Sequence, residues 1–210
     1  MSEGKLHSLI LACDYRVDDV ARIWELFERQ RSGLAAIGVH HVVGYLSLWD
    51  PGRILVTMGI RHPRSVRDVL RSPAIFELFD TSGVDDIPPI FGGEVVEKIE
   101  LDDNGAGDSV TRVIVGAVSP VPDVLSLMAQ LHARLDRFRQ AGVRKVWVYR
   151  ELDDGREVMI LQEVEDAAAA REWISHPDTA AEWMSQAGCG AYPAVFVGRL
   201  AHVMTIDQPG

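Results

Sequence analysis

The sequence contains very little lysine and cysteine. Lysine occurs only at Lys5, Lys98 and Lys145, and cysteine only at Cys13 and Cys189. Two cysteines are too few for the disulfide framework of a small secreted domain, so we expect both thiols to be free. The excess of arginine over lysine, with abundant alanine, valine and glycine, is typical of a GC-rich bacterial gene and carries no information about mechanism.

The chain also lacks the positive charge of a general nucleic-acid-binding protein. It has 21 Lys and Arg against 31 Asp and Glu, which gives a formal net charge of −10, whereas a phosphate backbone requires a basic face. No apolar run reaches the length of a transmembrane helix, and residues 1–15 are too weakly apolar and basic for a signal peptide. The sequence therefore predicts a cytoplasmic protein whose partners include neither nucleic acid nor a membrane.

The chain contains no sequence motif that identifies a catalysed reaction. There is no CxxC pair, no HExxH helix, no Ser-His-Asp arrangement and no nucleotide-binding fingerprint. The glycine pair at Gly105 and Gly107 precedes an expected strand, whereas a phosphate-binding loop leads into a helix. Whether the protein is an enzyme is left open by the sequence.

The strongest feature present is an internal repeat. Residues 37–73 and 141–177 share one pattern, 104 residues apart. The matched pairs are Gly38/Gly142, Val42/Val146, Tyr45/Tyr149 and Pro73/Pro177. A repeat at a fixed offset indicates two copies of one structural unit.

Each copy has the hydrophobic pattern of a β-α-β-β-α-β unit, the ferredoxin-like arrangement. The expected strands are 6–13, 39–49, 53–60 and 94–101 in copy one, and 110–118, 143–152, 157–164 and 194–206 in copy two. The expected helices begin near residues 18, 63 and 74, and near residues 122, 166 and 179. We expect repeat one over 1–101, a polar linker over 102–109 and repeat two over 110–206.

The strands are apolar on both faces, as in VIVGAV and ILVTMGI, so a second layer must cover the face that the helices leave open. With this strand order and the breaks at Pro73 and Pro177, nearly the whole chain resembles the dimeric α/β-barrel superfamily, which includes antibiotic-biosynthesis monooxygenase-like and stress-responsive barrel proteins. The resemblance implies an α+β fold of two tandem ferredoxin-like repeats packed sheet to sheet as a pseudo-dimeric α/β barrel. One chain would then build the barrel, as a monomeric pseudo-dimer or as a homodimer.

The resemblance also implies a range of functions, because this superfamily hosts oxygenases, haem-degrading and haem-binding proteins, isomerases and dehydratases. We expect a small-molecule-binding protein, in the form of a cofactor-independent monooxygenase-like enzyme acting on an apolar or aromatic compound, or of a haem-binding relative. The alternative is a non-catalytic structural or regulatory module whose barrel is filled by side chains. Fold likeness alone does not decide between them.

Strand alternation selects the candidate site residues. It places His41 and Tyr45 on one face of copy one, and Lys145, Trp147 and Tyr149 on the matching face of copy two. We expect this face to line the barrel interior. His41 and Tyr45 are the catalytic candidates, and the three residues of copy two are the ligand-binding candidates.

His7 is the third catalytic candidate. Small Ala12 suits the side of the strand that packs on helices, so we expect His7, Leu9, Leu11 and Cys13 to face inward. A neutral imidazole at His7 or His41 could exchange a proton or ligate haem iron.

Other histidines have more ordinary interpretations. His132 and Asp136 are four residues apart on an expected helix, but no third ligand accompanies them, and we predict no metal site. His202, late on the last strand, should return to the end of the sheet where His40 and His41 begin their strand.

Overall fold

The computed structural model describes residues 9–61, 69–82, 88–101, 112–153, 155–175 and 195–206. His7, Cys189 and the expected linker at 102–109 lie outside the described residues. The chain divides into two compact units. Unit 1 comprises Met1–Glu94 and Leu200–Gly210, and unit 2 comprises Val95–Arg199.

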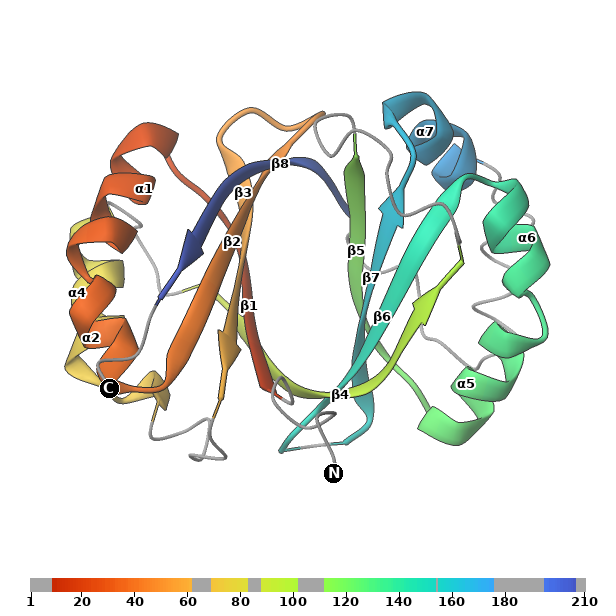
Figure 1. Cartoon of the computed structure of the whole chain (residues 1–210), viewed down its shortest axis with the longest axis horizontal. Helices are drawn as coiled ribbons and strands as arrows, with labels where there is room; N and C mark the ends of the chain where they lie inside the picture. Colours follow the sequence, from red (N-terminus) through yellow and green to blue (C-terminus); the bar gives the residue numbers. More distant parts are fainter. Residues whose placement is uncertain are drawn as a thin grey trace. The chain divides into compact units, whose positions relative to one another are not determined.

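Unit 1 contains a sheet of antiparallel strand pairs with its helices on one face (Figure 1). Its elements are β1 (Leu9–Arg16), α1 (Val20–Arg29), α2 (Arg31–Ala36), β2 (Val39–Ser47), β3 (Arg53–Ile60), α4 (Pro73–Ser82) and the start of β4 (Ile90–Glu100). Strand β1 pairs with both β3 and β4, and β2 pairs with β3. The end of β8 (Phe196–Thr205) lies beside β2, because the N–H of Ile206 donates to the carbonyl of His40 at 2.8 Å.

Local sequence signals explain how the first helix starts and how the helical segment ends. The Asp19 carboxylate accepts the N–H of Arg22 and caps α1, because the first turn of a helix leaves its N–H groups unpaired. The chain then leaves α2 for β2 through Gly38, whose φ of 91° is a conformation that glycine adopts without strain. Gly142, with a φ of 81°, makes the matching turn in unit 2. These requirements explain why both features recur 104 residues later.

Unit 2 repeats the arrangement. Its elements are β5 (Val113–Pro120), α5 (Val124–His132), α6 (Leu135–Gln140), β6 (Val143–Glu151), β7 (Glu157–Val164), α7 (Ala167–Ser175) and the start of β8. Strand β7 lies between β5 and β6. Asp123 and Asp166 cap α5 and α7, by accepting backbone N–H groups at 2.7 and 2.8 Å. The end of β4 lies beside β6, where the N–H of Leu101 donates to the carbonyl of Arg144 at 2.8 Å.

Strands β4 and β8 each begin in one unit and end in the other. The hydrogen-bonded strand order is therefore β1-β3-β2-β8-β5-β7-β6-β4, and it closes because β4 also pairs with β1. This order confirms the predicted α+β fold of two tandem ferredoxin-like repeats. No helix among the described residues is both long and apolar enough to cross a bilayer.

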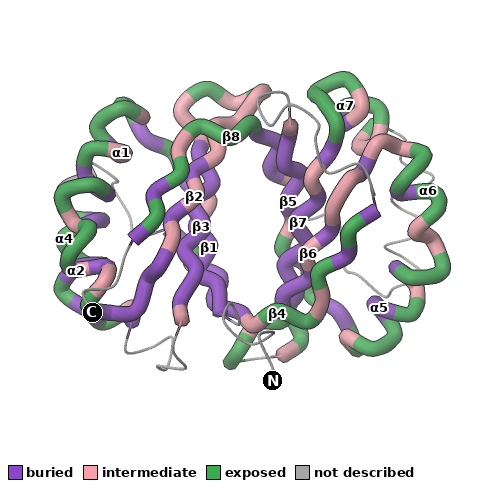
Figure 2. The backbone as a smooth tube through the Cα atoms, viewed as in Figure 1, coloured by how far each residue is buried: buried purple, intermediate pink, exposed green. Residues whose placement is uncertain are grey.

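The expected orientation of β1 was wrong. Leu9, Leu11 and Cys13 belong to the core that packs under the helices, with Ile23 and Phe27 of α1. The helices of unit 1 need large aliphatic side chains beneath them to fill the space. Figure 2 shows that β1 is buried over most of its length. Small Ala12 therefore points to the other face, beside Thr57 of β3.

The corresponding core of unit 2 contains a buried amide, which gives a first prediction. Gln162 lies between Val115 and Val146 in the sheet register and is only 9% exposed. Its Oε1 accepts no hydrogen bond in the described part of the chain. The matched residue in unit 1 is Met58, also buried. We expect Gln162→Met to raise the free energy of unfolding by about 1–3 kcal/mol in urea titrations, because an unsatisfied buried amide is removed.

The reciprocal change is the matched control for this prediction. Met58→Gln should lower the free energy of unfolding by about 1–3 kcal/mol, because it buries a new amide among aliphatic side chains. A Gln162→Met protein that is less stable than wild type would contradict the prediction and indicate a bound water on Oε1.

Candidate functional site

The helix-free face of the unit 1 sheet holds the first two candidate residues. The ring of Trp24, on α1, lies against the backbone of Gly44 so closely that a Cβ there would collide with it. Gly44 therefore faces the helices, and alternation turns His41 and Tyr45 to the opposite face. In register across β1, β3 and β2, the rows of that face are Ile10–Gly59–His41, Ala12–Thr57–Val43 and Asp14–Leu55–Tyr45.

His41 occupies a defined position on this face. Its imidazole lies directly over Gly59, where a Cβ would collide with the ring. The ring of His40 meets it edge to face, with centroids 4.3 Å apart. The strand pairing shifts register between Val39 and His41, so His40 is the extra residue of a β-bulge. The bulge thus places two consecutive imidazoles side by side at the start of β2.

The residues beside His41 are small. Ala12, Thr57 and Val43 form the next row of the face, and Ala12 and Thr57 are both 4% exposed. Gly59 adds no side chain at all. The strand face between His41 and Tyr45 therefore carries few side-chain atoms of its own.

An ion pair lies at the Tyr45 end of the same face. Both oxygens of Asp14 accept hydrogen bonds from Arg53, at 2.8 and 2.6 Å. The hydrogen bond to Asp14 is the main cause that raises the pKa of Arg53 above its ordinary value. A bidentate pair of this kind fixes both side chains in orientation.

The matching face of unit 2 has bulkier side chains. Its rows are Ile114–Glu163–Lys145, Gly116–Leu161–Trp147 and Val118–Met159–Tyr149. Leu161 replaces the matched Thr57, and Trp147 replaces Val43. Burial raises the pKa of Tyr149 to about 12, so its hydroxyl stays protonated at neutral pH. The two faces are therefore not chemically equivalent.

The structure brings the candidate residues together within each unit. His41 and Tyr45 share one face of unit 1, and Lys145, Trp147 and Tyr149 share one face of unit 2. His7 lies outside the described residues. Sequence reasoning missed the Asp14–Arg53 pair. With the correct orientation of β1, Asp14 is predicted to lie on the same face as Tyr45, in the same row, and the pair could then have been found.

The remaining histidines occupy other surroundings. His132 Nε2 lies 2.9 Å from Glu97, and Asp136 pairs with Arg139 at 2.8 Å. Within the described ranges, no three His, Cys, Asp or Glu side chains converge as metal ligands.

His202 lies in unit 1, but its ring is away from the candidate face. The ring stacks on Trp24 of α1, with centroids 5.1 Å apart and planes at 4°. The end of β8 lies beside His40 through the Ile206–His40 hydrogen bond, but His202 itself stacks on Trp24, which lies against Gly44. Since Trp24 marks the helix face of the sheet, His202 is not part of the candidate site.

Comparison with known proteins shows the fold alone. No family model matches the chain, and no curated protein sequence matches it. Among solved structures, an anthrone oxidase-like protein superposes with a TM-score of 0.68 at 15% identity, covering 99% of this chain and 97% of its own. A monooxygenase-like protein from Listeria innocua gives 0.53 at 10% identity, covering 93% and 94%.

A third structure, of a major regulator of staphylococcal pathogenesis, gives a TM-score of 0.53 at 10% identity and covers 92% of this chain and 99% of its own. The strand order and these superpositions define a tandem, ferredoxin-like member of the dimeric α/β-barrel fold. Other solved structures with this architecture include monooxygenase-like proteins. That fold carries both enzyme-like and regulatory proteins, so the site residues must decide the function.

Proposed function

We propose that this protein binds a small apolar or aromatic molecule on the helix-free face of unit 1 and oxidises it with dioxygen, as a cofactor-independent, monooxygenase-like enzyme. The observation that carries the proposal is the position of His41 over Gly59, next to the small side chains of Ala12 and Thr57. A planar molecule needs few side-chain atoms beneath it and a polar group at its edge. The likeness to an anthrone oxidase-like protein supports an aromatic ketone as the substrate class.

In the proposed reaction, His41 is the general base. An activated methylene group of the substrate loses a proton to the neutral imidazole, and the carbanion reacts with dioxygen. One oxygen atom enters the product as a carbonyl oxygen, and the other leaves as water with the two hydrogens of the methylene group. Tyr45 is assigned to hold the substrate's oxygen atom by donating a hydrogen bond.

We also propose a ligand-binding role for the matching face of unit 2, considered by itself. Trp147 and Tyr149 offer aromatic surface, and Lys145 offers a positive charge beside Glu163. Aromatic rings stabilise stacked aromatic ligands by about 0.5–1.5 kcal/mol beyond the area they bury. We assign these three residues to ligand binding and none of them to the chemical step.

The alternative function is a non-catalytic regulatory or structural module. The bulky Trp147, Leu161 and Met159 of unit 2 favour it, because side chains that fill a strand face leave no room for a substrate. The superposition on a regulator of pathogenesis is consistent with this alternative.

Haem fits unit 1 less well than an aromatic ketone does. A haem propionate needs a basic partner, and Arg53 is held by both oxygens of Asp14. We therefore derive no chemistry through haem. A Soret band that appears on adding hemin and disappears in the His41→Ala variant would reverse this judgement.

The proposal is tested by oxygen uptake with anthrone as the probe, corrected for its spontaneous oxidation. We expect the wild type to accelerate oxygen uptake and product absorbance, and His41→Ala to lower the rate by about 100-fold or more, as for the loss of a general base. Gly59→Ala should have a similar effect, because the new methyl group displaces the imidazole. His132→Ala, on the surface beside Glu97, is the matched histidine control and should leave the rate unchanged.

Stability measurements separate a catalytic from a structural histidine. His41→Ala should change the melting temperature little, whereas Leu131→Ala should lower the free energy of unfolding by about 2–5 kcal/mol because that side chain is fully buried. If His41→Ala unfolds the protein as Leu131→Ala does, or if no aromatic ligand shifts the wild-type melt, the non-catalytic alternative is correct.

A further inference from the structure

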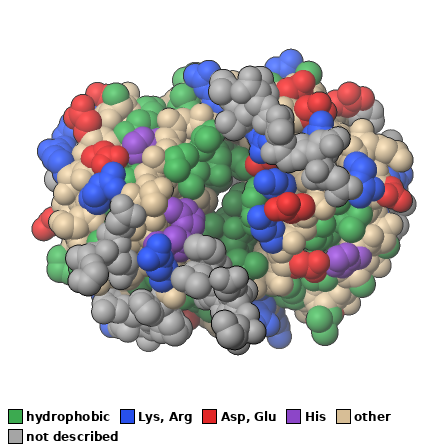
Figure 3. Space-filling view, viewed as in Figure 1, with side chains coloured by type: hydrophobic (Ala, Val, Ile, Leu, Met, Phe, Trp, Pro, Cys, Tyr) green, Lys and Arg blue, Asp and Glu red, His purple; other side chains and the backbone are tan. Residues whose placement is uncertain are grey.

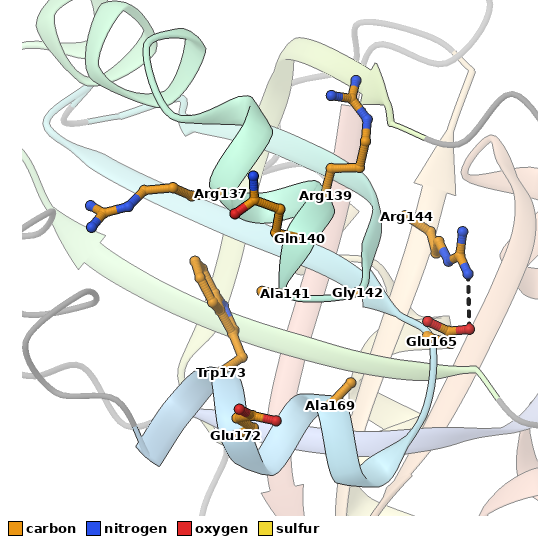
Figure 4. A pocket seen from close by; sticks show the side chains of 10 residues that line it. All are labelled: Arg137, Arg139, Gln140, Ala141, Gly142, Arg144, Glu165, Ala169, Glu172 and Trp173. Atoms are coloured by element: carbon orange, nitrogen blue, oxygen red, sulfur yellow. Dashed lines mark ion pairs between the residues drawn. The ribbon is translucent and has the colours of Figure 1, made fainter.

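A hollow of about 460 Å³ lies in unit 2, away from the strand faces (Figure 4). It is formed by the last turn of α6, the turn into β6 and the outer side of α7. The residues that line it are Arg137, Arg139, Gln140, Ala141, Gly142, Arg144, Glu165, Ala169, Glu172 and Trp173. Its volume is that of a small-molecule site, and His41, Tyr45 and Trp147 do not contribute to it.

Trp173 provides the aromatic surface of the hollow. Figure 4 shows its indole extending from α7 toward the last turn of α6, beside Arg137 and Gln140. Phe138 supports the indole from within unit 2, with ring centroids 5.0 Å apart and planes at 55°. Trp173 is only partly buried, whereas Phe138 is fully buried. A partly exposed indole held in place by a core residue is a stacking surface for a planar ligand.

The charged side chains around the indole favour a ligand with a single negative charge. Arg139 donates to the Leu101 carbonyl at 3.0 Å and pairs with Asp136. Arg144 pairs with Glu165 at 2.9 Å, at the other end of the hollow. Arg137 is exposed, and in the described part of the chain no hydrogen bond or ion pair engages its guanidinium.

Two glutamates limit the charge of the ligand. Glu165 and Glu172 line the same hollow, and Figure 3 shows acidic and basic side chains interspersed over unit 2. A multiply charged anion would be repelled by these carboxylates. A single carboxylate that reaches Arg137 would avoid most of that repulsion.

The repeat shows that these side chains are not required by the fold. Arg137, Arg139 and Trp173 correspond to Gly33, Ala35 and Val69 in copy one. In unit 1, a Cβ on Gly33 would lie 3.0 Å from the Cβ of Ala74, so α2 packs closely on α4. The same fold thus forms in copy one without arginines or an indole at these positions. The hollow of unit 2 therefore has cationic and aromatic side chains that the fold does not require.

We propose that this hollow is a second binding site and that it takes a planar aromatic monocarboxylate. The ring of the ligand stacks on Trp173, and its carboxylate accepts hydrogen bonds from the Arg137 guanidinium. Ala169 lines the same hollow beside Gly142 and occupies it with a methyl group only. The site is independent of the oxidation proposed for unit 1.

The test is a titration of the full chain with 1-naphthoate. Binding is monitored by calorimetry and by the indole N–H signal of Trp173 in NMR spectra, which is assigned with the Trp173→Phe variant. We expect a saturable shift of that signal. Arg137→Ala should weaken binding by about tenfold or more, the loss of a charge-assisted contact. Ala169→Phe should abolish binding by filling the hollow. Arg29→Ala, an exposed arginine of α1, is the charge-matched control and should bind as the wild type does.

Further probes fix the ligand class. Neutral 1-naphthylmethanol should bind about tenfold more weakly than 1-naphthoate, and inorganic phosphate should not compete. If the Trp173 signal does not move at millimolar 1-naphthoate, if Arg137→Ala binds as tightly as wild type, or if phosphate displaces 1-naphthoate, the proposal is overturned. Should Ala169→Phe fail to fold, Arg137→Glu replaces it and must lose binding. His41→Ala, which stops the proposed oxidation, should leave this titration unchanged.

Discussion

Two fragments, 1–104 and 105–210, are expected to be unfolded or insoluble when produced separately and to co-purify when produced together. Met204 and Ile206, at most 1% exposed, belong to the core of unit 1 although they lie near the end of the chain. Ile206 also donates its N–H to His40. Fragment 1–104 lacks both residues, so its core is incomplete. Loss of a buried aliphatic side chain costs about 2–5 kcal/mol, and two such losses approach the whole stability of a domain.

The second fragment is incomplete for the same reason. Ile99 and Leu101 are buried, and the N–H of Leu101 donates to Arg144 of β6, but both residues belong to fragment 1–104. Affinity purification with a tag on one fragment, followed by circular dichroism, measures the association. Extending the first fragment with residues 195–206 through a short linker is the control, and it should recover part of the missing core. Two folded, monomeric fragments that do not associate would contradict the prediction.

The repeat made most of the fold predictable from sequence. Strand β7 and strand β3 were predicted with their observed bounds, because turn residues mark both ends of each run. The orientation of β1 was not predictable in the same way. Its residues Leu9 to Cys13 are apolar without alternation, so periodicity cannot distinguish the two faces. The inference from small Ala12 failed because large residues, and not small ones, fill the space beneath α1.

The candidate site was predictable only in part. Alternation correctly grouped His41 with Tyr45, since a strand with a helix-packed Gly44 has one possible orientation. The contact of His41 with Gly59 was not predictable. It depends on a shift of the strand register at His40, and no residue pattern in the sequence predicts that shift. The hollow beside Trp173 escaped detection for a different reason. Its residues come from separate elements, and Trp173 has the spacing of an ordinary core residue.

Raising the pH from 8 to 11 is expected to destabilise the protein through its buried ionisable groups. Burial is the main cause that raises the pKa of the Cys13 thiol from 9.0 to about 12, with a smaller effect of Asp14. The thiol is neutral in the folded protein and ionises more readily in the unfolded chain. Its contribution to stability is therefore fully present below pH 9 and is lost as the pH rises toward 12. At about 1.4 kcal/mol per unit of pKa difference, the loss by pH 11 is about 2–3 kcal/mol.

Tyr149 adds to the same loss at higher pH, because burial raises its pKa from 10.0 to about 12. Urea titrations at pH 8 and pH 11 measure the total. Cys13→Ala should be somewhat less stable than wild type at pH 8, through the small cavity it leaves, but should lose about 2–3 kcal/mol less on going to pH 11. Ser47→Ala is the control: it removes a hydroxyl that accepts the N–H groups of Trp49 and Asp50 and does not titrate in this range, so it should lower stability at pH 8 but lose as much as the wild type on going to pH 11. Equal losses in wild type and Cys13→Ala would mean that the thiol is as readily ionised in the folded protein as in the unfolded chain, and that the apolar packing of β1 against α1 does not exclude water from it.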